Sequence, residues 1–121
     1  MANDDDVTVW FNPRCSKCRS VMGILADEGV DAAEFRYLER APGRDELERV
    51  LRLLGTDDPR ALCRTAEDRY SELGLATATR EQLLDALVAN PVLIERPIIV
   101  RGDRAVVGRP PERVLELLKP A

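Results

Sequence analysis

The sequence contains no histidine among its 121 residues. This absence excludes Ser-His and Cys-His catalytic pairs and metal sites that depend on imidazole ligands. A structural zinc site needs four ligands, and the three cysteines cannot supply them, so no bound metal is expected. Lysine is also scarce, since Lys17 and Lys119 are the two lysines among 18 basic residues. Positive charge is therefore carried mainly by arginine, which keeps its charge and binds oxyanions through paired hydrogen bonds.

Long apolar runs are missing as well. No stretch approaches the roughly 20 apolar residues of a membrane-spanning helix, and Met1–Asp6 lacks the basic and apolar regions of a signal peptide. The net charge of −4 argues against a broad nucleic-acid surface. Cysteines without an export signal suit a reducing compartment. We therefore expect a cytoplasmic protein with neither a membrane nor a nucleic-acid partner.

Both ends of the chain favour strands paired with helices. β-Branched and aromatic residues predict a strand at Val7–Phe11, and apolar residues at helical spacing predict a helix at Ser16–Glu28. A second strand is expected at Ala33–Leu38. Later, Pro97–Val100 and Ala105–Val107 predict a hairpin, and the prolines that follow suit the first turn of a last helix.

The middle of the chain, residues 43–89, favours helices and shows no convincing strand. Gly43 and Gly55 delimit a charged helix with an apolar side. Pro59–Arg64 predicts a short helix that contains Cys63, for which core packing is the expected role. Thr79–Gln82 resembles a capping box at the start of another helix.

Cys15 and Cys18 form a C-x-x-C pair between the first strand and the first helix. The unpaired N–H groups and the positive end of the dipole at a helix start stabilise a thiolate, which is the reactive form of cysteine. Three residues along a helical turn also place two Cα atoms about 5.5 Å apart, within disulfide range. The pair thus indicates thiol chemistry at Cys15, although two buried structural cysteines are the alternative. The Cys-x5-Arg loop of thiol phosphatases is excluded, because Val21 occupies the sixth position after Cys15.

Eight motifs together resemble those of the glutaredoxin-coupled arsenate reductase family. They keep that family's order, and nearly its spacing, from residue 7 to about residue 118. The motifs are Asn12-Pro-Arg-Cys15, Tyr37-Leu-Glu39, Arg44-Asp-Glu-Leu47, Arg60-Ala-Leu-Cys-Arg64, Tyr70-Ser-Glu-Leu-Gly-Leu75, Asn90-Pro-Val-Leu-Ile94, Arg96-Pro-Ile-Ile-Val100 and Gly108-Arg-Pro110.

The resemblance implies an α/β fold, a thioredoxin-like mixed four-stranded sheet with a helical insertion in the middle of the chain. We accordingly expect a single arsenate-reductase-like domain over residues 1–121. Its thioredoxin-like core is expected at about 7–40 and 92–118, and its insertion at about 43–89.

The resemblance also implies which residues act. Its nucleophilic cysteine falls on Cys15, and its three oxyanion-binding arginines fall on Arg64, Arg96 and Arg109. The proline that faces the nucleophile falls on Pro97, which implies a cis Arg96–Pro97 bond. Guanidinium groups around an oxyanion would offset its repulsion of a thiolate and lower the thiol pKa. Each arginine also admits an ordinary surface role; for Arg64 this would be an ion pair with an acidic neighbour such as Glu67.

Two positions depart from the family pattern. Well-known members carry a histidine just before Asn-Pro, and here that position is Phe11. Cys18 stands where those members lack a cysteine, so it could resolve a Cys15 intermediate or simply pack.

The main hypothesis is therefore reduction of arsenate to arsenite through a thioarsenate intermediate on Cys15. No cofactor is expected to stay bound. Electrons would come from glutathione or another low-molecular-weight thiol with glutaredoxin, or through a Cys15–Cys18 disulfide that thioredoxin could reduce. One alternative is a redox-responsive transcription regulator of the Spx type, which shares the C-x-x-C, although Gly108-Arg-Pro110 favours a reductase. Another is a glutathione-linked thiol reductase with a different substrate.

Overall fold

The computed structural model describes residues 6–119, so the prediction that the N-terminal segment holds no signal peptide falls mostly outside the described residues. The chain forms two compact units. One contains Met1–Tyr37 together with Arg96–Ala121, and the other contains Leu38–Glu95. The second unit includes the stretch in which helices were predicted. No helix among residues 6–119 is both long and apolar enough to cross a bilayer.

The first unit is built on the predicted mixed four-stranded sheet, with strand order β2-β1-β3-β4. Strand β1 (Val7–Trp10) runs parallel to β2 (Ala32–Phe35) and antiparallel to β3 (Ile98–Arg101). Strand β3 pairs antiparallel with β4 (Arg104–Val107), as the predicted hairpin requires. Gly102 in its two-residue turn has φ +58°, a conformation that glycine adopts without steric cost.

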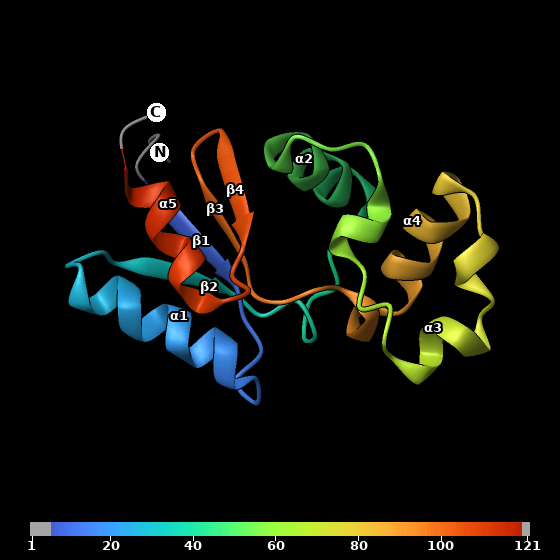
Figure 1. Cartoon of the computed structure of the whole chain (residues 1–121), viewed down its shortest axis with the longest axis horizontal. Helices are drawn as coiled ribbons and strands as arrows, with labels where there is room; N and C mark the ends of the chain where they lie inside the picture. The colour runs from blue at the N-terminus through green and yellow to red at the C-terminus, as the bar shows by residue number, and fades with distance from the viewer. Residues whose placement is uncertain (1–5, 120–121) are drawn as a thin grey trace. The chain divides into compact units, whose positions relative to one another are not determined.

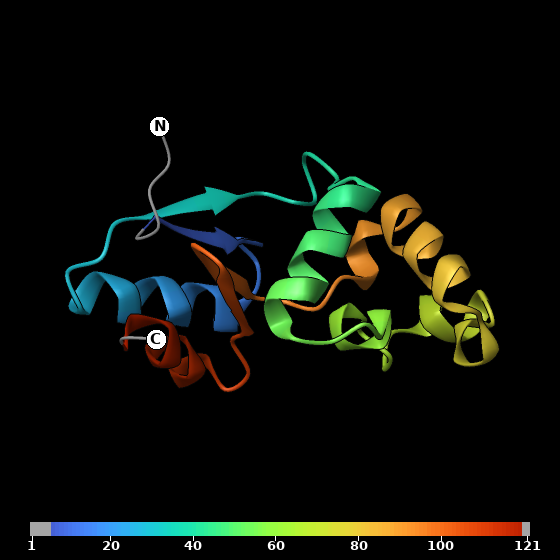
Figure 2. The same ribbon diagram turned by 90° about the horizontal axis from the view of Figure 1, so that it is seen from above.

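The helices of the first unit pack on one face of this sheet. Helix α1 (Ser16–Asp27) and helix α5 (Leu115–Leu118), which continues the 3₁₀ turn η4 (Pro111–Val114), lie on the same side in both Figure 1 and Figure 2. Alternate residues of the strands point to them because side chains alternate across a sheet. The buried cluster between the layers contains Val7, Val9, Phe11, Cys15, Cys18, Val21, Leu25, Ile99, Val106, Val114 and Leu117.

The second unit is helical. It contains α2 (Arg44–Leu54), η1 (Pro59–Leu62), α3 (Asp68–Glu72), η2 (Leu75–Thr77), α4 (Arg80–Ala89) and η3 (Pro91–Leu93). The capping box predicted at the start of α4 is confirmed: the backbone N–H of Gln82 donates to Thr79 Oγ1 (3.2 Å), and the backbone N–H of Thr79 donates to Gln82 Oε1 (2.9 Å).

One predicted helix of the second unit is confirmed in part. The helix expected over Pro59–Arg64 ends at Leu62, and Cys63 is extended, with φ −111° and ψ 135°. Cys63 forms an isolated antiparallel β-bridge with Ile94. The backbone N–H of Arg64 donates to the Leu93 carbonyl (2.7 Å) on one side of that bridge. This long-range pairing outweighs the local helical preference, and a single sequence window does not reveal it.

Candidate active site

The loop before α1 fixes the position of Cys15. The side-chain Oδ1 of Asn12 accepts the backbone N–H of Arg14 (2.9 Å), and the carbonyl of Asn12 accepts the backbone N–H of Cys15 (2.9 Å). An asparagine before a proline often makes such a turn. The Arg19 guanidinium donates to the Pro13 carbonyl (2.8 Å), which ties the loop back to the helix. The Asn-Pro-Arg-Cys motif thus places Cys15 at the N-cap of α1.

Cys15 and Cys18 lie in the buried cluster with contrasting proton affinities. Burial raises the pKa of Cys15, but hydrogen bonding from the backbone N–H and the thiol of Cys18, the charge of Arg96 and the backbone N–H of Lys17 together lower it below the ordinary value of a thiol. Burial, the main cause, and the neighbouring Cys15 raise the pKa of Cys18 to about 12. The arrangement therefore favours the thiolate at Cys15 and keeps Cys18 protonated.

Arg96 precedes β3 and Arg109 follows β4, and a hydrogen bond joins the two residues at this end of the sheet. Arg109 Nε donates to the Arg96 carbonyl (2.7 Å), and the backbone N–H of Gly108 donates to the Pro97 carbonyl (2.8 Å). The Arg96–Pro97 bond is cis, the geometry that the resemblance implied. The Arg109–Pro110 bond is also cis. No sequence signal identified this second bond, because the Pro110-Pro111 pair suggested no more than a helix start.

Close packing explains why the residue before Arg109 is a glycine, Gly108. A Cβ atom at this position would lie 2.9 Å from Pro97 Cγ, 3.0 Å from Val21 Cγ2 and 3.1 Å from Ile99 Cδ1. The absence of a side chain lets the end of β4 approach both the proline segment and α1. Gly108 therefore allows the close approach of the segments that carry Arg96 and Arg109, a role that the sequence alone did not assign.

Arg64 belongs to the second unit. Its guanidinium forms an ion pair with Glu67 (2.8 Å) and donates to the Val92 carbonyl (3.3 Å). The ion pair is the ordinary surface role that the sequence left open for this residue, and these contacts themselves assign it no substrate.

Comparison with known proteins identifies the family of the chain. Residues 10–117 match the model of the ArsC family. The chain belongs to the ArsC family. The uncharacterized protein YfgD of Escherichia coli is 43% identical over 114 residues, which cover 93% of this chain and 96% of YfgD. The arsenate reductase of Haemophilus influenzae is 38% identical over 114 residues, covering 93% of this chain and 98% of that protein.

Solved structures agree with the ArsC assignment. The arsenate reductase from Vibrio cholerae superposes with a TM-score of 0.89 at 40% identity, covering 94% of this chain and 98% of that protein. The strand order and the helical middle segment are therefore those of an arsenate-reductase fold, and the resemblance found in the sequence motifs is confirmed.

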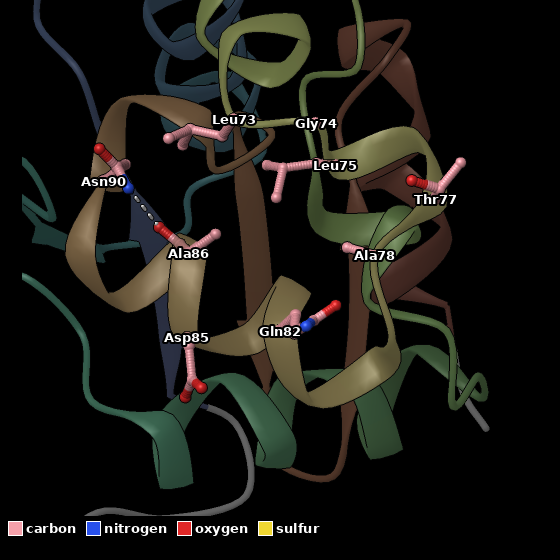
Figure 3. Close-up of a pocket in the computed structure, with 9 residues that line it drawn as sticks. All are labelled: Leu73, Gly74, Leu75, Thr77, Ala78, Gln82, Asp85, Ala86 and Asn90. Carbon is pink, nitrogen blue, oxygen red and sulfur yellow. Dashed lines mark hydrogen bonds between the residues drawn. The ribbon is translucent and has the colours of Figure 1, made fainter.

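Other features of this ArsC-family chain do not belong to the thiol site. Burial, and secondarily the charge of Glu95, raise the pKa of Cys63 to about 11, which keeps it a thiol. A hollow of about 550 Å³ lies on the second unit beside α4 (Figure 3). Its described lining contains neither cysteine nor arginine, and Asn90 Nδ2 within it donates to the Ala86 carbonyl (3.0 Å). The hollow therefore lacks the groups for redox chemistry on an oxyanion.

Proposed function

We propose that this protein reduces arsenate to arsenite, with Cys15 as the nucleophile. The observation that carries the proposal is the position of Cys15 at the start of α1, where helix N–H groups and the Arg96 charge lower its pKa. Membership of the ArsC family and the arsenate reductases among its relatives support the choice of substrate.

The reaction would begin with attack of the Cys15 thiolate on arsenic. A sulfur–arsenic bond forms and an arsenate oxygen leaves as hydroxide or water, which gives a thioarsenate ester. Arg96 and Arg109 would offset the negative charge that builds up on the remaining oxygens. Arg64 is assigned to the same task by its position in the family motif. The anionic substrate and the thiolate repel each other. Removal of a guanidinium is therefore expected to slow this attack more than the later steps of the reaction.

A second thiol must then take the Cys15 sulfur so that arsenite leaves. Glutathione followed by glutaredoxin is one source, and the neighbouring Cys18 is the other. In either case the protein needs no bound cofactor, and the thiol is a co-substrate.

A competing function is reduction of a different, disulfide-containing substrate. It is favoured by Phe11, which occupies the position where the family resemblance places a histidine. The Arg36 guanidinium lies 5.8 Å from the Phe11 ring centroid, so this position holds an aromatic ring and a cation rather than a titratable imidazole.

Arsenite formation under steady-state conditions tests the proposal. The wild type, Cys15→Ser and Cys63→Ser are each supplied with arsenate and either glutathione–glutaredoxin or thioredoxin with its reductase. We expect Cys15→Ser to lose at least about a thousandfold in rate, because a hydroxyl is a far weaker nucleophile. Cys63→Ser serves as the control for replacing a buried cysteine and should keep its rate. Full activity in Cys15→Ser would refute the proposal. A wild type that is inactive on arsenate with both donors but reduces disulfides would favour the competing function.

A further inference from the structure

We infer that Cys18 is the second thiol of the reaction, so that one chain supplies both electrons through a Cys15–Cys18 disulfide and an external dithiol then reduces that disulfide. This inference rests on the proposed function and chooses between the two thiol sources that it leaves open. It concerns a cysteine that sequence comparison with well-known family members would not select.

The geometry of α1 brings the two sulfurs together. Cys15 is the N-cap and Cys18 lies one turn later on the same helix, a spacing compatible with the roughly 5.5 Å between Cα atoms that disulfides prefer. Both side chains also belong to the buried cluster between α1 and the sheet, so they lie on the same side of the helix.

Burial restricts the possible partners of Cys18. Its exposed fraction is 0%, whereas that of Cys15 is 7%. A thiol from solution therefore has no direct path to Cys18. The reactive neighbour of Cys18 is Cys15, and an external reductant would approach the Cys15 sulfur of the disulfide.

Formation of the Cys15–arsenic ester would lower the pKa of Cys18. In the free protein, burial and the adjacent Cys15 sulfur keep Cys18 protonated, while hydrogen bonding from the Asn12 backbone and the charge of Arg96 act in the opposite direction. Once Cys15 is bonded to arsenic, it no longer carries the negative charge that raises the pKa of Cys18. Burial, the largest cause of the raised pKa, remains, and so do the two groups that favour the Cys18 thiolate. Formation of the ester thus makes Cys18 a stronger acid and a better nucleophile.

The electrons balance over two steps. Cys18 gives up its proton, and its sulfur attacks the Cys15 sulfur; the sulfur–sulfur bond forms as the sulfur–arsenic bond breaks. The electron pair of that bond goes to arsenic, which changes from As(V) to As(III), and arsenite leaves with protons from the thiols and solvent. The two cysteines are oxidised to one disulfide. A dithiol reductant then exchanges with it and restores both thiols.

Proximity favours this route over glutathione. A well-oriented neighbouring group can act at an effective concentration on the order of 10⁵ M, whereas glutathione is present at roughly millimolar levels. An intermediate with Cys18 one turn away should therefore close the disulfide before glutathione arrives.

A single-turnover experiment without any added thiol tests the inference. Fully reduced wild type, Cys18→Ser, Cys18→Ala and Cys63→Ser are mixed with excess arsenate, and arsenite and free thiols are counted. We expect wild type and Cys63→Ser to release about one equivalent of arsenite per chain and to lose two thiols. Tryptic mapping should show the peptide of Cys15 joined to that of Cys18, since Lys17 lies between them. Both Cys18 variants should release at least about a hundredfold less arsenite until glutathione is added.

The outcomes separate this inference from the function on which it rests. If the wild type releases no arsenite without glutathione but turns over with glutathione–glutaredoxin, Cys18 does not resolve the intermediate and the proposed function stands. If no donor supports arsenite formation, the proposed function fails and the inference fails with it. The wild-type peptide map decides the matter even if a Cys18 variant does not fold.

Discussion

Cys15 and Cys18 are one helical turn apart, yet their environments drive their proton affinities in opposite directions. Both are buried, which by itself disfavours a thiolate at either position. Cys15 faces the N–H groups of the first turn of α1, whereas Cys18 faces Cys15 itself. A single helix start therefore lowers the pKa of one cysteine while the pKa of the next is raised. Cys63 lacks such donors, and its burial beside Glu95 keeps it protonated.

The close packing around Gly108 can be tested with a single substitution. Gly108→Ala would place a methyl group within 2.9 Å of Pro97 Cγ, so we expect the free energy of unfolding to fall by about 1–3 kcal/mol. Gly23→Ala is the matched control, because Gly23 lies within α1 and a Cβ there meets no atom within 4 Å. This control should raise the free energy of unfolding by up to about 1 kcal/mol. Urea denaturation of both variants measures the difference, and an unchanged Gly108→Ala would contradict the close approach described here.

At the scale of single elements, the start of α4 depends on its capping box. Thr79→Ala removes the acceptor for the backbone N–H of Gln82, which should lower the free energy of unfolding by about 1 kcal/mol. Thr65→Ala changes an exposed threonine outside the helices and should leave stability nearly unchanged. Thermal unfolding followed by circular dichroism distinguishes the two; equal melting temperatures would show that the cap contributes nothing.

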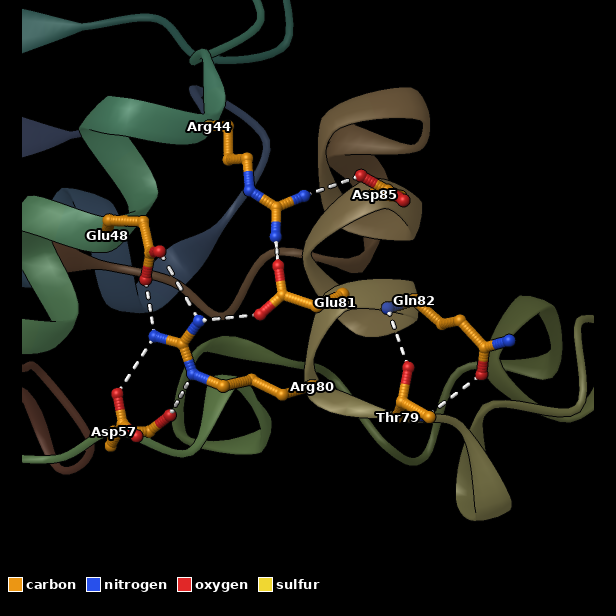
Figure 4. A network of polar contacts seen from close by, with 8 residues as sticks. All are labelled: Arg44, Glu48, Asp57, Thr79, Arg80, Glu81, Gln82 and Asp85. Carbon is orange, nitrogen blue, oxygen red and sulfur yellow. Dashed lines mark hydrogen bonds and ion pairs between the residues drawn. The ribbon is translucent and has the colours of Figure 1, made fainter.

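Ion pairs connect α4 with α2 inside the second unit. Arg80 contacts Glu48 of α2 and Asp57 (2.9 Å), while Arg44 of α2 contacts Glu81 and Asp85 (2.7 Å to the latter) (Figure 4). Hydrogen bonding from Arg80 is the main cause that lowers the pKa of Glu48. A carboxylate with a lowered pKa stabilises the fold above its unfolded pKa of about 4.3 and loses that contribution as the pH falls through its folded pKa.

This network predicts a specific dependence on pH. Arg80→Gln should destabilise the protein at pH 7 and should flatten the loss of stability on acidification below about pH 4.3, because Glu48 then titrates near its ordinary pKa. Arg14→Gln serves as the control, since Arg14 is exposed and is not among the charges that lower the pKa of Glu48. Chemical denaturation at several pH values measures both curves. Parallel curves for wild type and Arg80→Gln would contradict the assigned ion pair.

At the scale of the whole molecule, the sequence predicted the elements that local patterns specify. The strands of the sheet, the helix after Cys15 and the capping box at Thr79 follow from hydrophobic periodicity and turn chemistry. The extended conformation of Cys63 could not be predicted, because it depends on pairing with the distant Ile94. The sequence patterns also gave no signal for α3 as a separate helix or for the second cis bond. Arg96 near the cysteine pair and the Gly108 contact likewise require β3 and β4 to return beside α1. Family motifs, and not periodicity, selected these positions in advance.

The central proposal is that Cys15, with its lowered pKa, is the nucleophile at the place where the oxyanion binds. The most direct measurement is the rate of Cys15 alkylation by iodoacetamide across pH, with and without arsenate, for wild type and Arg96→Gln, with each cysteine followed by peptide mass mapping.

We predict that Cys15 alone among the three cysteines reacts at neutral pH. The half-point, the pH at which its alkylation rate is half of the maximum, should lie below that of an ordinary thiol, because the start of α1 and Arg96 stabilise the thiolate. Arg96→Gln should move the half-point upward, and arsenate should slow the wild-type reaction. A half-point at or above that of an ordinary thiol, with no effect of arsenate, would contradict the account.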